Sequence, residues 1–502
     1  MLRTQSRLCH AVCPKRNLTP HRDSLYPDPL IGGPISSAPK LSPGVQKYVD
    51  EAQKLIAQRD AALARMKTMR FDTIAVHGLY TVEEALQRNQ GAVIEPLYLS
   101  TSQAYADSDE LEAALAYLVP TWCYTRIANP TTYYLEWVLA LLEGYKTGYD
   151  TSCCVMASGM AAITQAVDPF LIKQKEGPER MNFVSCVQVY GGTYQQFSLR
   201  KMKERGIECR WVLHPWDIQD WKSKIDEETR FVYMEMPSNP QQSFADIKAL
   251  VDLAHSFEVP VIIDATCATP ALMRPIAYGA DIVVHSLTKS ITSGGFAIGG
   301  ALISRKPITT WVKNDHPLFK ESFAEYVKFL PYRDNGPAAS PVNAIFALND
   351  LRTLRSKMDV VSQNCQKVAE FLQTHPRVYQ VDYLGLPSYH LHGLAKKYMA
   401  LADSADGAGH EVNRYGHLMS FRVDGPPANA RKVFDKFQMI YRATDLGRIK
   451  SVATIPAIST HQQQGEEARK AADVPPQLIR LCVGAEHPDD VIADVDQALK
   501  SL

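Results

Sequence analysis

The chain has 502 residues, with 54 basic and 54 acidic side chains and no formal net charge at pH 7. This balance argues against a nucleic-acid-binding protein, which normally carries a basic excess, and gives no reason to expect an anionic membrane as a partner. No apolar run approaches the length of a membrane span. Hydrophobic residues at 46% and charged residues at 22% are ordinary for a globular protein.

The beginning of the chain is basic. Its first 22 residues contain no Asp or Glu and carry Arg3, Arg7, Lys15, Arg16 and Arg22. Such a segment can be an organellar transit peptide, whereas Pro14 and Pro20 fit a disordered tail or a start codon assigned too far upstream equally well. We expect a cytoplasmic protein, with a transit peptide in residues 1–22 as the alternative, and a disordered or extended tail over residues 1–43.

The ten cysteines are scattered and form no CxxC pair with zinc spacing. Several stand inside apolar, strand-like runs, which predicts buried free thiols in a reducing compartment and no metal site.

After the tail, Val45 to Met66 approximate the helical period of 3.6 residues, which predicts a packing or oligomer helix. We assign residues 44–135 to an N-terminal helix and oligomer arm.

From about residue 151, short apolar runs alternate with helix-like stretches near 160–175, 193–205, 246–257 and 270–278. This alternation predicts an α/β fold, with a mostly parallel seven-stranded sheet and helices on both faces, in a large domain over residues 136–340. Neither a G-x-G-x-x-G after the first strand nor a Walker loop is present, so dinucleotide and ATP sites lack their signatures. The expected strands are TSCCVMA, MNFVSC, ECRWVL, RFVYMEM, VPVIID, DIVVHS and GALIS.

The composition changes near 305–340, which we expect to form loops. Ser340-Pro341 then predicts the start of a long helix running towards Thr374. Strands near RVYQVDY, HLMSFRV and LIRLCV and a final helix from Pro488 to Leu499 complete a smaller α+β domain over residues 341–502. Within it, GLPSYHLHGLAKKY and STHQQQGEEARKAAD are expected to be polar loops.

The most informative segment is IVVHSLTKSITSGGFAIGG, residues 282–300, in which a short apolar run leads to Ser286, Thr288 and Lys289. Two hydroxyls beside a lysine at a strand end can hold a phosphate while the lysine does covalent chemistry. Lysine forms a Schiff base with an aldehyde once its pKa is lowered. Pyridoxal 5′-phosphate (PLP) carries both an aldehyde and a phosphate, although a solvated surface lysine is the alternative.

Asp264 ends the strand-like run VPVIID upstream of that lysine. Ligands of open α/β sheets bind outside the carboxyl ends of strands, and a PLP enzyme needs a carboxylate beside the pyridine nitrogen. The alternative is a helix N-cap before Thr266. The order of Asp264 and Lys289 along the chain favours the cofactor role.

Two further turns are candidates for cofactor contacts. Ser158-Gly159-Met160 ends a strand and opens a helix, whose N–H groups can bind phosphate, although an ordinary turn would look the same. Tyr190, before two glycines, could stack on an aromatic cofactor and act in acid–base chemistry, or it could be a core tyrosine before a tight turn.

Three polar positions complete the set. Arg126, two residues after Tyr124, can grip a phosphate, although it could be a plain surface arginine. Asn239 could bond a ring hydroxyl or simply precede a proline in a turn. Arg480 stands inside an apolar strand, where its charge needs a partner, either a substrate carboxylate or a structural one.

These segments together resemble the Cys/Met-metabolism family of PLP-dependent enzymes, of fold type I, which includes the trans-sulfuration enzymes. The resemblance covers roughly residues 70–500. It rests on the ordered set Y-x-R…NPT, SGM, YGGTY, E-x-P-S-N-P, DAT, HSLTK and RLCVG.

The resemblance implies roles for individual residues. Lys289 would be the Schiff-base lysine, Asp264 the partner of the pyridinium and Tyr190 a ring-stacking, catalytic residue. Arg480, helped by the segment around Ser451, would bind the substrate carboxylate, and residues 136–340 would bind PLP. The expected cofactor-binding residues are Tyr124, Arg126, Ser158, Gly159, Met160, Tyr190, Asn239, Asp264, Thr266, Ser286, Thr288 and Lys289.

Within the family, SGGFAIGG, RDNGPAASPVNAIFALNDLRTL and ISTHQQQGEEARKAADVPPQLIRL resemble the O-acetylhomoserine sulfhydrylase branch. Asn349-Asp350 and Arg352 depart from that branch, and ATDLGRIKS matches it loosely. The expected reaction is γ-replacement on an O-activated homoserine by sulfide or a thiol. The alternatives are γ- or β-elimination from cystathionine, methionine or cysteine, and a PLP-fold protein that only binds.

The resemblance also implies a homodimer or homotetramer with shared active sites, in which Tyr124 and Arg126 reach the phosphate of a neighbouring subunit's cofactor. The expected ligands are small-molecule amino acids.

Overall fold

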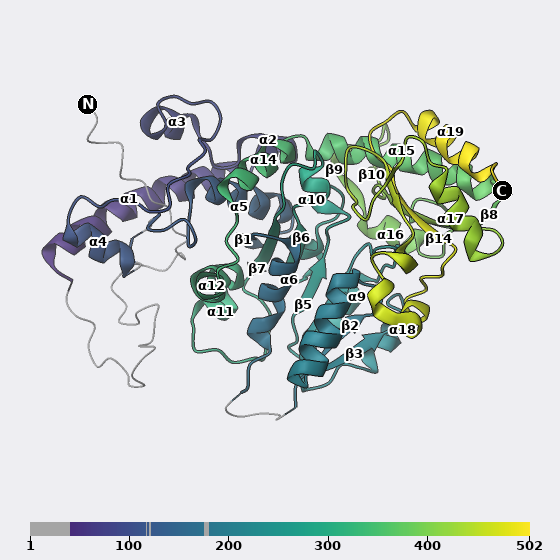
Figure 1. Ribbon diagram of the computed structural model, residues 1–502. Coiled ribbons are helices and arrows are strands. Elements are labelled where there is room, and N and C mark those ends of the chain that lie inside the picture. Colours follow the sequence, from purple (N-terminus) through teal and green to yellow (C-terminus); the bar gives the residue numbers. More distant parts are fainter. Residues whose placement is uncertain (1–40, 117, 120–121, 175–179) are drawn as a thin grey trace.

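A computed structural model describes residues 41–116, 118–119, 122–174 and 180–502. It is elongated, with an N-terminal helical arm at one end, a large sheet in the middle and a smaller C-terminal domain at the other end (Figure 1). The predicted transit segment, 1–22, and nearly all of the predicted tail lie outside the described residues.

The large sheet has the seven predicted strands, in the order β1-β7-β6-β5-β4-β2-β3. Only β7 is antiparallel to its neighbours, so the prediction of a mostly parallel sheet is confirmed. The strands are β1 (Asp150–Met156), β2 (Asn182–Cys186), β3 (Glu208–Val212), β4 (Thr229–Glu235), β5 (Val261–Asp264), β6 (Ile282–Ser286) and β7 (Gly300–Lys306).

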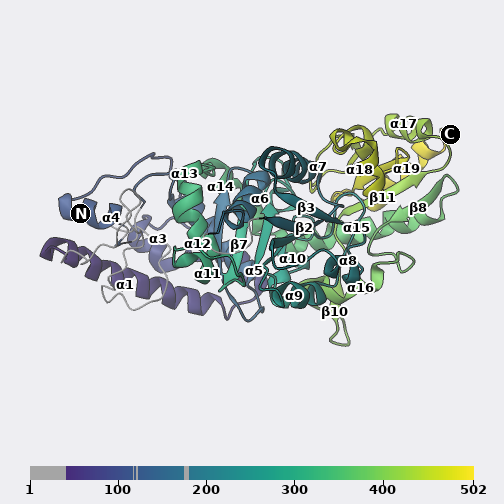
Figure 2. The ribbon, with the colours of Figure 1, turned by 90° about the horizontal axis from the view of Figure 1, so that it is seen from below.

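Helices lie on both sides of this sheet; in Figure 2, α6 (Gly159–Val167) and α7 (Gly191–Gln195) lie on one side and α9 (Ile247–His255) on the other. Side-chain caps begin several of them. Ser158 accepts a hydrogen bond from an N–H of the first turn of α6, and Asp246 does the same for α9. These strand-to-helix turns stand at the carboxyl ends of the strands, where a ligand would bind.

The small domain has a five-stranded sheet in the order β12-β13-β14-β11-β8, and a separate ribbon pairs β9 with β10. Its strands are β8 (Val378–Asp382), β9 (Ala400–Ala405), β10 (Glu411–Asn413), β11 (Leu418–Val423), β12 (Tyr441–Arg442), β13 (Val452–Thr454) and β14 (Leu478–Cys482). Helices α17 (Pro427–Asp435) and α19 (Pro488–Leu499) complete the predicted α+β unit.

The prediction of one long helix is wrong in one respect, because the structure has two helices here, α14 (Pro341–Leu351) and α15 (Leu354–Thr374). The break falls at Arg352 and Thr353, where Arg352 forms an ion pair with Glu95 of the arm. The break therefore coincides with a contact distant in sequence, and neither glycine nor proline stands at it.

The predicted polar loops contain helices as well. The first holds α16 (His392–Tyr398), and the second holds α18 (Gly465–Ala471), preceded by the turn η7 (Gln462–Gln464). Residues 305–340, also predicted as loops, contain α11 (Leu318–Glu321), α12 (Phe323–Val327), η5 (Lys328–Tyr332) and α13 (Arg333–Asn335). Their aromatic residues join the main core: the ring of Phe323 stacks on that of Phe170, with centroids 4.9 Å apart.

Helix boundaries differ from the predictions in the large domain. The helix expected over 160–175 ends at Val167 and passes into a 3₁₀ turn, η1 (Asp168–Phe170), that contains Pro169. The stretch expected at 193–205 continues α7 as a widened helix, η2 (Gln196–Lys203), and the one at 270–278 is two short turns, α10 (Thr269–Leu272) and η3 (Pro275–Tyr278).

The arm consists of α1 (Pro43–Met66), α2 (Phe71–His77), α3 (Val82–Arg88) and α4 (Ser108–Leu115), and the buried helix α5 (Pro130–Glu143) connects it to the sheet. The helix α1 begins where the periodicity predicted it and packs on α4, with the Tyr48 hydroxyl donating to Asp107. Large apolar side chains remain exposed along the arm: Val82, Leu86, Val93, Ile94, Leu97 and Leu99.

The eight cysteines in the described part of the chain are buried and free, as predicted. In those same ranges, no helix has both the length and the apolar character that crossing a bilayer requires. Within the described residues, no group of three His, Cys, Asp or Glu side chains is arranged to hold a metal ion.

One buried ion pair connects α5 to η5 and β1. Lys328 Nζ lies 2.6 Å from Glu136 Oε1, both side chains are almost fully buried, and the same oxygen accepts the Val155 N–H. We expect Lys328→Met to lower the free energy of unfolding by about 3–5 kcal/mol, because it leaves a buried carboxylate without its cation. Urea unfolding followed by circular dichroism measures this loss.

The matched control is Lys248→Met, which removes an exposed lysine paired with Asp252. It should change stability very little, because solvent screens exposed pairs. Equal losses in the two variants would show that the buried pair has no special role.

Candidate active site

The site forms at the carboxyl ends of the central strands. In the sheet register, Glu235 at the end of β4 pairs with Asp264 at the end of β5, and Asp264 pairs with Val284 of β6. The last residue of β6 is Ser286, and Lys289 follows in the next turn. This arrangement brings together side chains that are far apart in the sequence.

Asp264 is buried, and its two carboxylate oxygens have different environments. Oδ1 accepts the Thr266 N–H at 3.0 Å and the Thr266 hydroxyl at 2.6 Å, whereas Oδ2 has only a long contact of 3.4 Å with the Tyr233 hydroxyl. Helix α10 starts later and has Ala268 as its cap residue, so the helix-cap alternative for Asp264 is wrong. Burial raises the pKa of Asp264, although Thr266 and the charge of His285 oppose it. A cation beside Oδ2 would stabilise this carboxylate, and a protonated pyridine nitrogen is such a cation.

Glu235 is a buried carboxylate that the sequence reasoning missed. Its oxygens accept the N–H of Tyr190 at 2.6 Å and the N–H of Asn239 at 2.8 Å. Burial and the charge of Asp264 raise the pKa of Glu235. Glu235 therefore holds the backbone of two predicted cofactor-binding residues beside Asp264. A glutamate ending the apolar run RFVYMEM was the available signal.

The turn before α6 and the end of β6 approach each other very closely. A Cβ on Gly159 would lie 2.7 Å from the Cβ of Ser286, and one on Gly300 would lie 2.0 Å from the Ser158 carbonyl oxygen. The Ser286 N–H donates to Thr266, and the Thr288 hydroxyl accepts the Gly299 N–H at 3.1 Å. First-turn N–H groups of a helix have no intrahelical acceptor. Those of α6, with the neighbouring hydroxyls, can therefore receive a phosphate group.

Tyr190 lies half-exposed at the start of α7. A Cβ on Gly192 would lie 2.6 Å from the Tyr190 ring and 3.3 Å from the Met160 sulfur, so ring and sulfur meet at this glycine. Tyr190 is thus placed beside the α6 turn.

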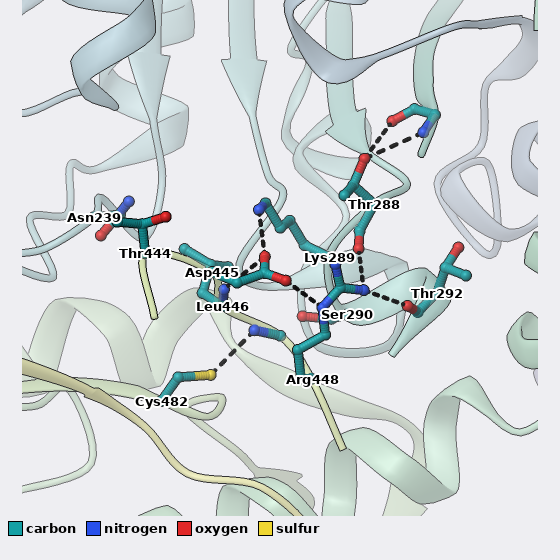
Figure 3. Close-up of polar contacts among 12 residues, drawn as sticks. Asn239, Thr288, Lys289, Ser290, Thr292, Thr444, Asp445, Leu446, Arg448 and Cys482 are labelled. Carbon is teal, nitrogen blue, oxygen red and sulfur yellow. Dashed lines mark hydrogen bonds and ion pairs between the residues drawn. The ribbon is translucent and has the colours of Figure 1, made fainter. Parts of the chain in front are cut away.

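Lys289 forms an ion pair that the sequence reasoning did not anticipate. Its Nζ donates to Asp445 Oδ1 at 2.6 Å, and Arg448 Nε pairs with the other carboxylate oxygen (Figure 3). Asp445 and Arg448 both belong to the segment ATDLGRIKS, which matches the sulfhydrylase branch loosely.

Arg480 is fully buried on β14 of the small domain and reaches the large domain. Its Nη1 donates to Asn239 Oδ1 at 3.1 Å, and its Nη2 donates to the carbonyl oxygens of Thr444 at 3.1 Å and Asp445 at 2.5 Å. Its Nε has no hydrogen-bond partner. All three acceptors are neutral, so a structural carboxylate does not bind this guanidinium in the described part of the chain.

Other predicted residues lie elsewhere. The hydroxyl of Ser451 donates to Glu486 and accepts the Gly484 N–H, so it bonds to the segment that follows β14. Arg126 stacks on Tyr124 and donates to the carbonyl oxygen of Arg333. Among the described residues, no hydrogen bond or ion pair joins Tyr124 or Arg126 to Lys289.

Two residues that depart from the sequence pattern of the sulfhydrylase branch, Asp350 and Arg352, have structural roles. Asp350 accepts the Gly294 N–H at 3.0 Å and pairs with Lys357 at 2.6 Å, so it holds the start of the glycine-rich loop after Lys289. Arg352 pairs with Glu95 and joins this region to the arm.

Comparison with known proteins agrees with this geometry. The profile of the family described as Cys/Met metabolism PLP-dependent enzyme matches residues 72–500. The chain belongs to this family, and it is therefore a PLP-dependent enzyme of sulfur amino-acid metabolism.

Individual relatives make the likeness more specific. The chain is 34% identical to the homocysteine synthase of Schizosaccharomyces pombe over 81% of this chain and 93% of that protein. It is 32% identical to the L-methionine gamma-lyase of Porphyromonas gingivalis over 86% of this chain and 97% of the lyase.

Among solved structures, a putative O-acetylhomoserine (thiol)-lyase from Campylobacter jejuni is similar, with a TM-score of 0.74 and 32% identity. The match covers 86% of this chain and all of that one (100%). That structure contains N′-pyridoxyl-lysine-5′-monophosphate.

His417 lies against the segment that follows Lys289. Its Nε2 is 3.4 Å from the Ser290 hydroxyl, and burial, with the charge of Arg480, lowers its pKa to about 4. Between pH 6.5 and 4 the unfolded chain therefore binds a proton that the folded protein does not, so stability falls as the pH falls through this window.

We expect the free energy of unfolding to be lower at pH 5 than at pH 7, with about 2 kcal/mol of the loss due to His417. Chemical denaturation at the two pH values measures this loss. His417→Gln should flatten the dependence, and an equally steep dependence in that variant would contradict the assignment.

Proposed function

We propose that this protein catalyses γ-replacement on O-acetylhomoserine or a related O-activated homoserine, with sulfide or a thiol as the incoming nucleophile. The observation that carries the proposal is the buried guanidinium of Arg480, held by neutral acceptors within one network that also contains Lys289. In the described part of the chain, no carboxylate pairs with this guanidinium, which lies in one network with Lys289 and Asp445. The guanidinium therefore suits the α-carboxylate of an amino acid.

PLP, when bound, supplies an aldehyde to which an amine can attach and a protonated ring that withdraws electrons. Asp264 would face the ring nitrogen, and Tyr190 would cover the ring. Ser286, Thr288 and the first turn of α6 would hold the phosphate.

The other residues act on the substrate. Arg480 would fix the α-carboxylate, and Asn239, through its side-chain oxygen, orients the guanidinium. Lys289 Nζ would take the Cα proton, which needs a positioned base within hydrogen-bond reach. Such acid–base contributions are worth about 10²–10⁴-fold each.

The relatives support the choice of reaction. Proteins named homocysteine synthase and O-acetyl-L-homoserine sulfhydrylase are 34% and 33% identical to this chain. Elimination is the second candidate, because a methionine gamma-lyase is 32% identical over a similar length.

An assay of the purified holoenzyme separates these reactions. With O-acetylhomoserine or O-succinylhomoserine plus sulfide, homocysteine and the free acid should form faster than 2-oxobutyrate forms from methionine or cystathionine. Rates are compared as kcat/KM, with thiol and keto-acid products quantified separately. Negligible homocysteine formation with rapid methionine or cystathionine cleavage would replace this proposal with a lyase.

Two variants control the assay. Lys289→Ala should abolish turnover and the visible absorbance of the cofactor–lysine adduct. Arg480→Ala should raise KM for every amino-acid substrate and spare kcat more than kcat/KM, because it removes binding that is uniform along the reaction. A protein that binds PLP but shows no spectral change with any amino acid would be the non-catalytic alternative.

We propose further that the active enzyme is a homodimer or homotetramer, in which Tyr124 and Arg126 serve the neighbouring subunit's site. Tyr124 is 45% exposed, and it follows an arm whose apolar side chains are also exposed. A second copy packed on the arm would bury this surface and bring Arg126 to a partner site.

Mixing two inactive variants tests this arrangement. Subunits with Lys289→Ala and with Arg126→Ala should recover about a quarter of wild-type activity after random exchange between dimers. Half of the dimers are then hybrids, with one intact site of two. Mixing Lys289→Ala with Asp264→Ala, both of which damage their own chain's site, should give no recovery. Failure of the first mixture after confirmed subunit exchange would contradict the shared site.

A further inference from the structure

Asp445 lies between Lys289 and Arg480 in the site, and it has no part in the proposed binding of cofactor and substrate. Oδ1 of its carboxylate accepts Lys289 Nζ at 2.6 Å and its own neighbour's N–H, that of Leu446, at 2.9 Å. The other oxygen pairs with Arg448 (Figure 3). The backbone carbonyl of Asp445 accepts a hydrogen bond from Arg480. One residue therefore contacts both the expected cofactor lysine and the expected substrate anchor.

The loop that carries Asp445 is fastened to the lysine segment. Arg448 Nη1 donates to the carbonyl oxygens of Thr288 at 2.9 Å and Thr292 at 3.1 Å, and the Ile449 N–H donates to Ser293 at 3.0 Å. Gly447 has a φ of +73°, and a Cβ there would lie 2.5 Å from the Ser290 backbone nitrogen. The small-domain loop thus fits against the turn on both sides of Lys289, which fixes the carboxylate relative to the amine.

The charges around the carboxylate keep it ionised. Burial would raise the pKa of Asp445, but the hydrogen bond and charge of Lys289, with Arg448, outweigh it, so the pKa is lowered. The guanidinium of Arg480 also faces this loop. Cys482 accepts the Gly447 N–H from below, and burial raises its pKa, so it stays a neutral thiol.

We propose that Asp445 is a positioning residue for Lys289. Its carboxylate holds the amine whenever the lysine is not covalently attached to the cofactor, and it stabilises the ammonium formed when Lys289 Nζ accepts the Cα proton of the substrate. This inference rests on the proposed role of Lys289, although its first test does not require bound PLP.

The proton balance is simple. The proton leaves Cα with its electron pair remaining on the substrate, and it stays on Nζ, so the carboxylate gains a full cation as partner without taking the proton itself. Arg448 shares the carboxylate, which limits how strongly Lys289 is held and leaves the amine able to return the proton.

The first experiment measures the reactivity of the Lys289 amine in the full chain after removal of the cofactor. An amine-acylating reagent is applied at several pH values, and mass spectrometry follows modification of the peptide containing Lys289, with the other lysines as internal reference. Asp445→Asn should accelerate modification near neutral pH by about tenfold, because the amine loses the carboxylate that holds it at 2.6 Å.

Two further variants make the test specific. Asp350→Asn removes a similar pair, between Asp350 of α14 and Lys357 of α15 at 2.6 Å, and it should leave Lys289 reactivity unchanged. Arg448→Gln should slow the modification, because the carboxylate then has Lys289 as its single cationic side-chain partner. Circular dichroism confirms that each variant is folded, and Asp445→Ser replaces Asp445→Asn if the latter is not.

An unchanged rate in Asp445→Asn, or an equal acceleration in Asp350→Asn, would overturn the proposal. In the holoenzyme, Asp445→Asn should lower kcat about tenfold with little change in KM and should move the acid limb of the kcat–pH profile to lower pH. If PLP fails to protect Lys289 of the wild-type protein from the reagent, the proposed function fails instead, and the two failures are therefore distinguishable.

Discussion

The site depends on one buried cation that is shared between two domains. Arg480 stands on the small-domain sheet, its guanidinium is fully buried, and it bonds to Asn239 of the large domain and to the loop at Thr444 and Asp445. Burying a charge is costly unless an opposite charge is available. The neutral acceptors orient the guanidinium without neutralising it, which suits it to the anionic substrate group proposed for this site.

A second constraint is the pair of buried carboxylates at the ends of β4 and β5. Glu235 and Asp264 lie side by side in the sheet register. Burial raises the pKa of both carboxyl groups, and the charge of Asp264 raises that of Glu235 further. Glu235 uses its oxygens on backbone N–H groups, whereas Asp264 keeps Oδ2 nearly free. The sheet therefore presents one carboxylate that builds the site and one that can bind a cationic ring.

Much of this could be predicted from sequence because the signals are local. The seven strands follow from short β-branched runs between turns, and Asp264 and Lys289 stand at strand ends, where the chain topology fixes their relative position. The break between α14 and α15 could not be predicted, since it accompanies a contact of Arg352 with Glu95, 257 residues away in the sequence. The helices of residues 305–340 could not be predicted from the sequence either, because packing of Phe323 on Phe170, rather than local propensity, stabilises them.

The sequence by itself determined the family, the order of the strands along the chain and the identity of the lysine, the aspartate and the buried arginine, because each belongs to a short motif with its own chemistry. Only the tertiary structure decided what surrounds them. Asp445 meets Lys289 across 156 residues of sequence, and Glu235 bonds to Tyr190 across 45. The packing of the two domains selects the first of these partners, and the order of the strands in the large sheet selects the second. No pattern of residues close together in the sequence predicts either contact.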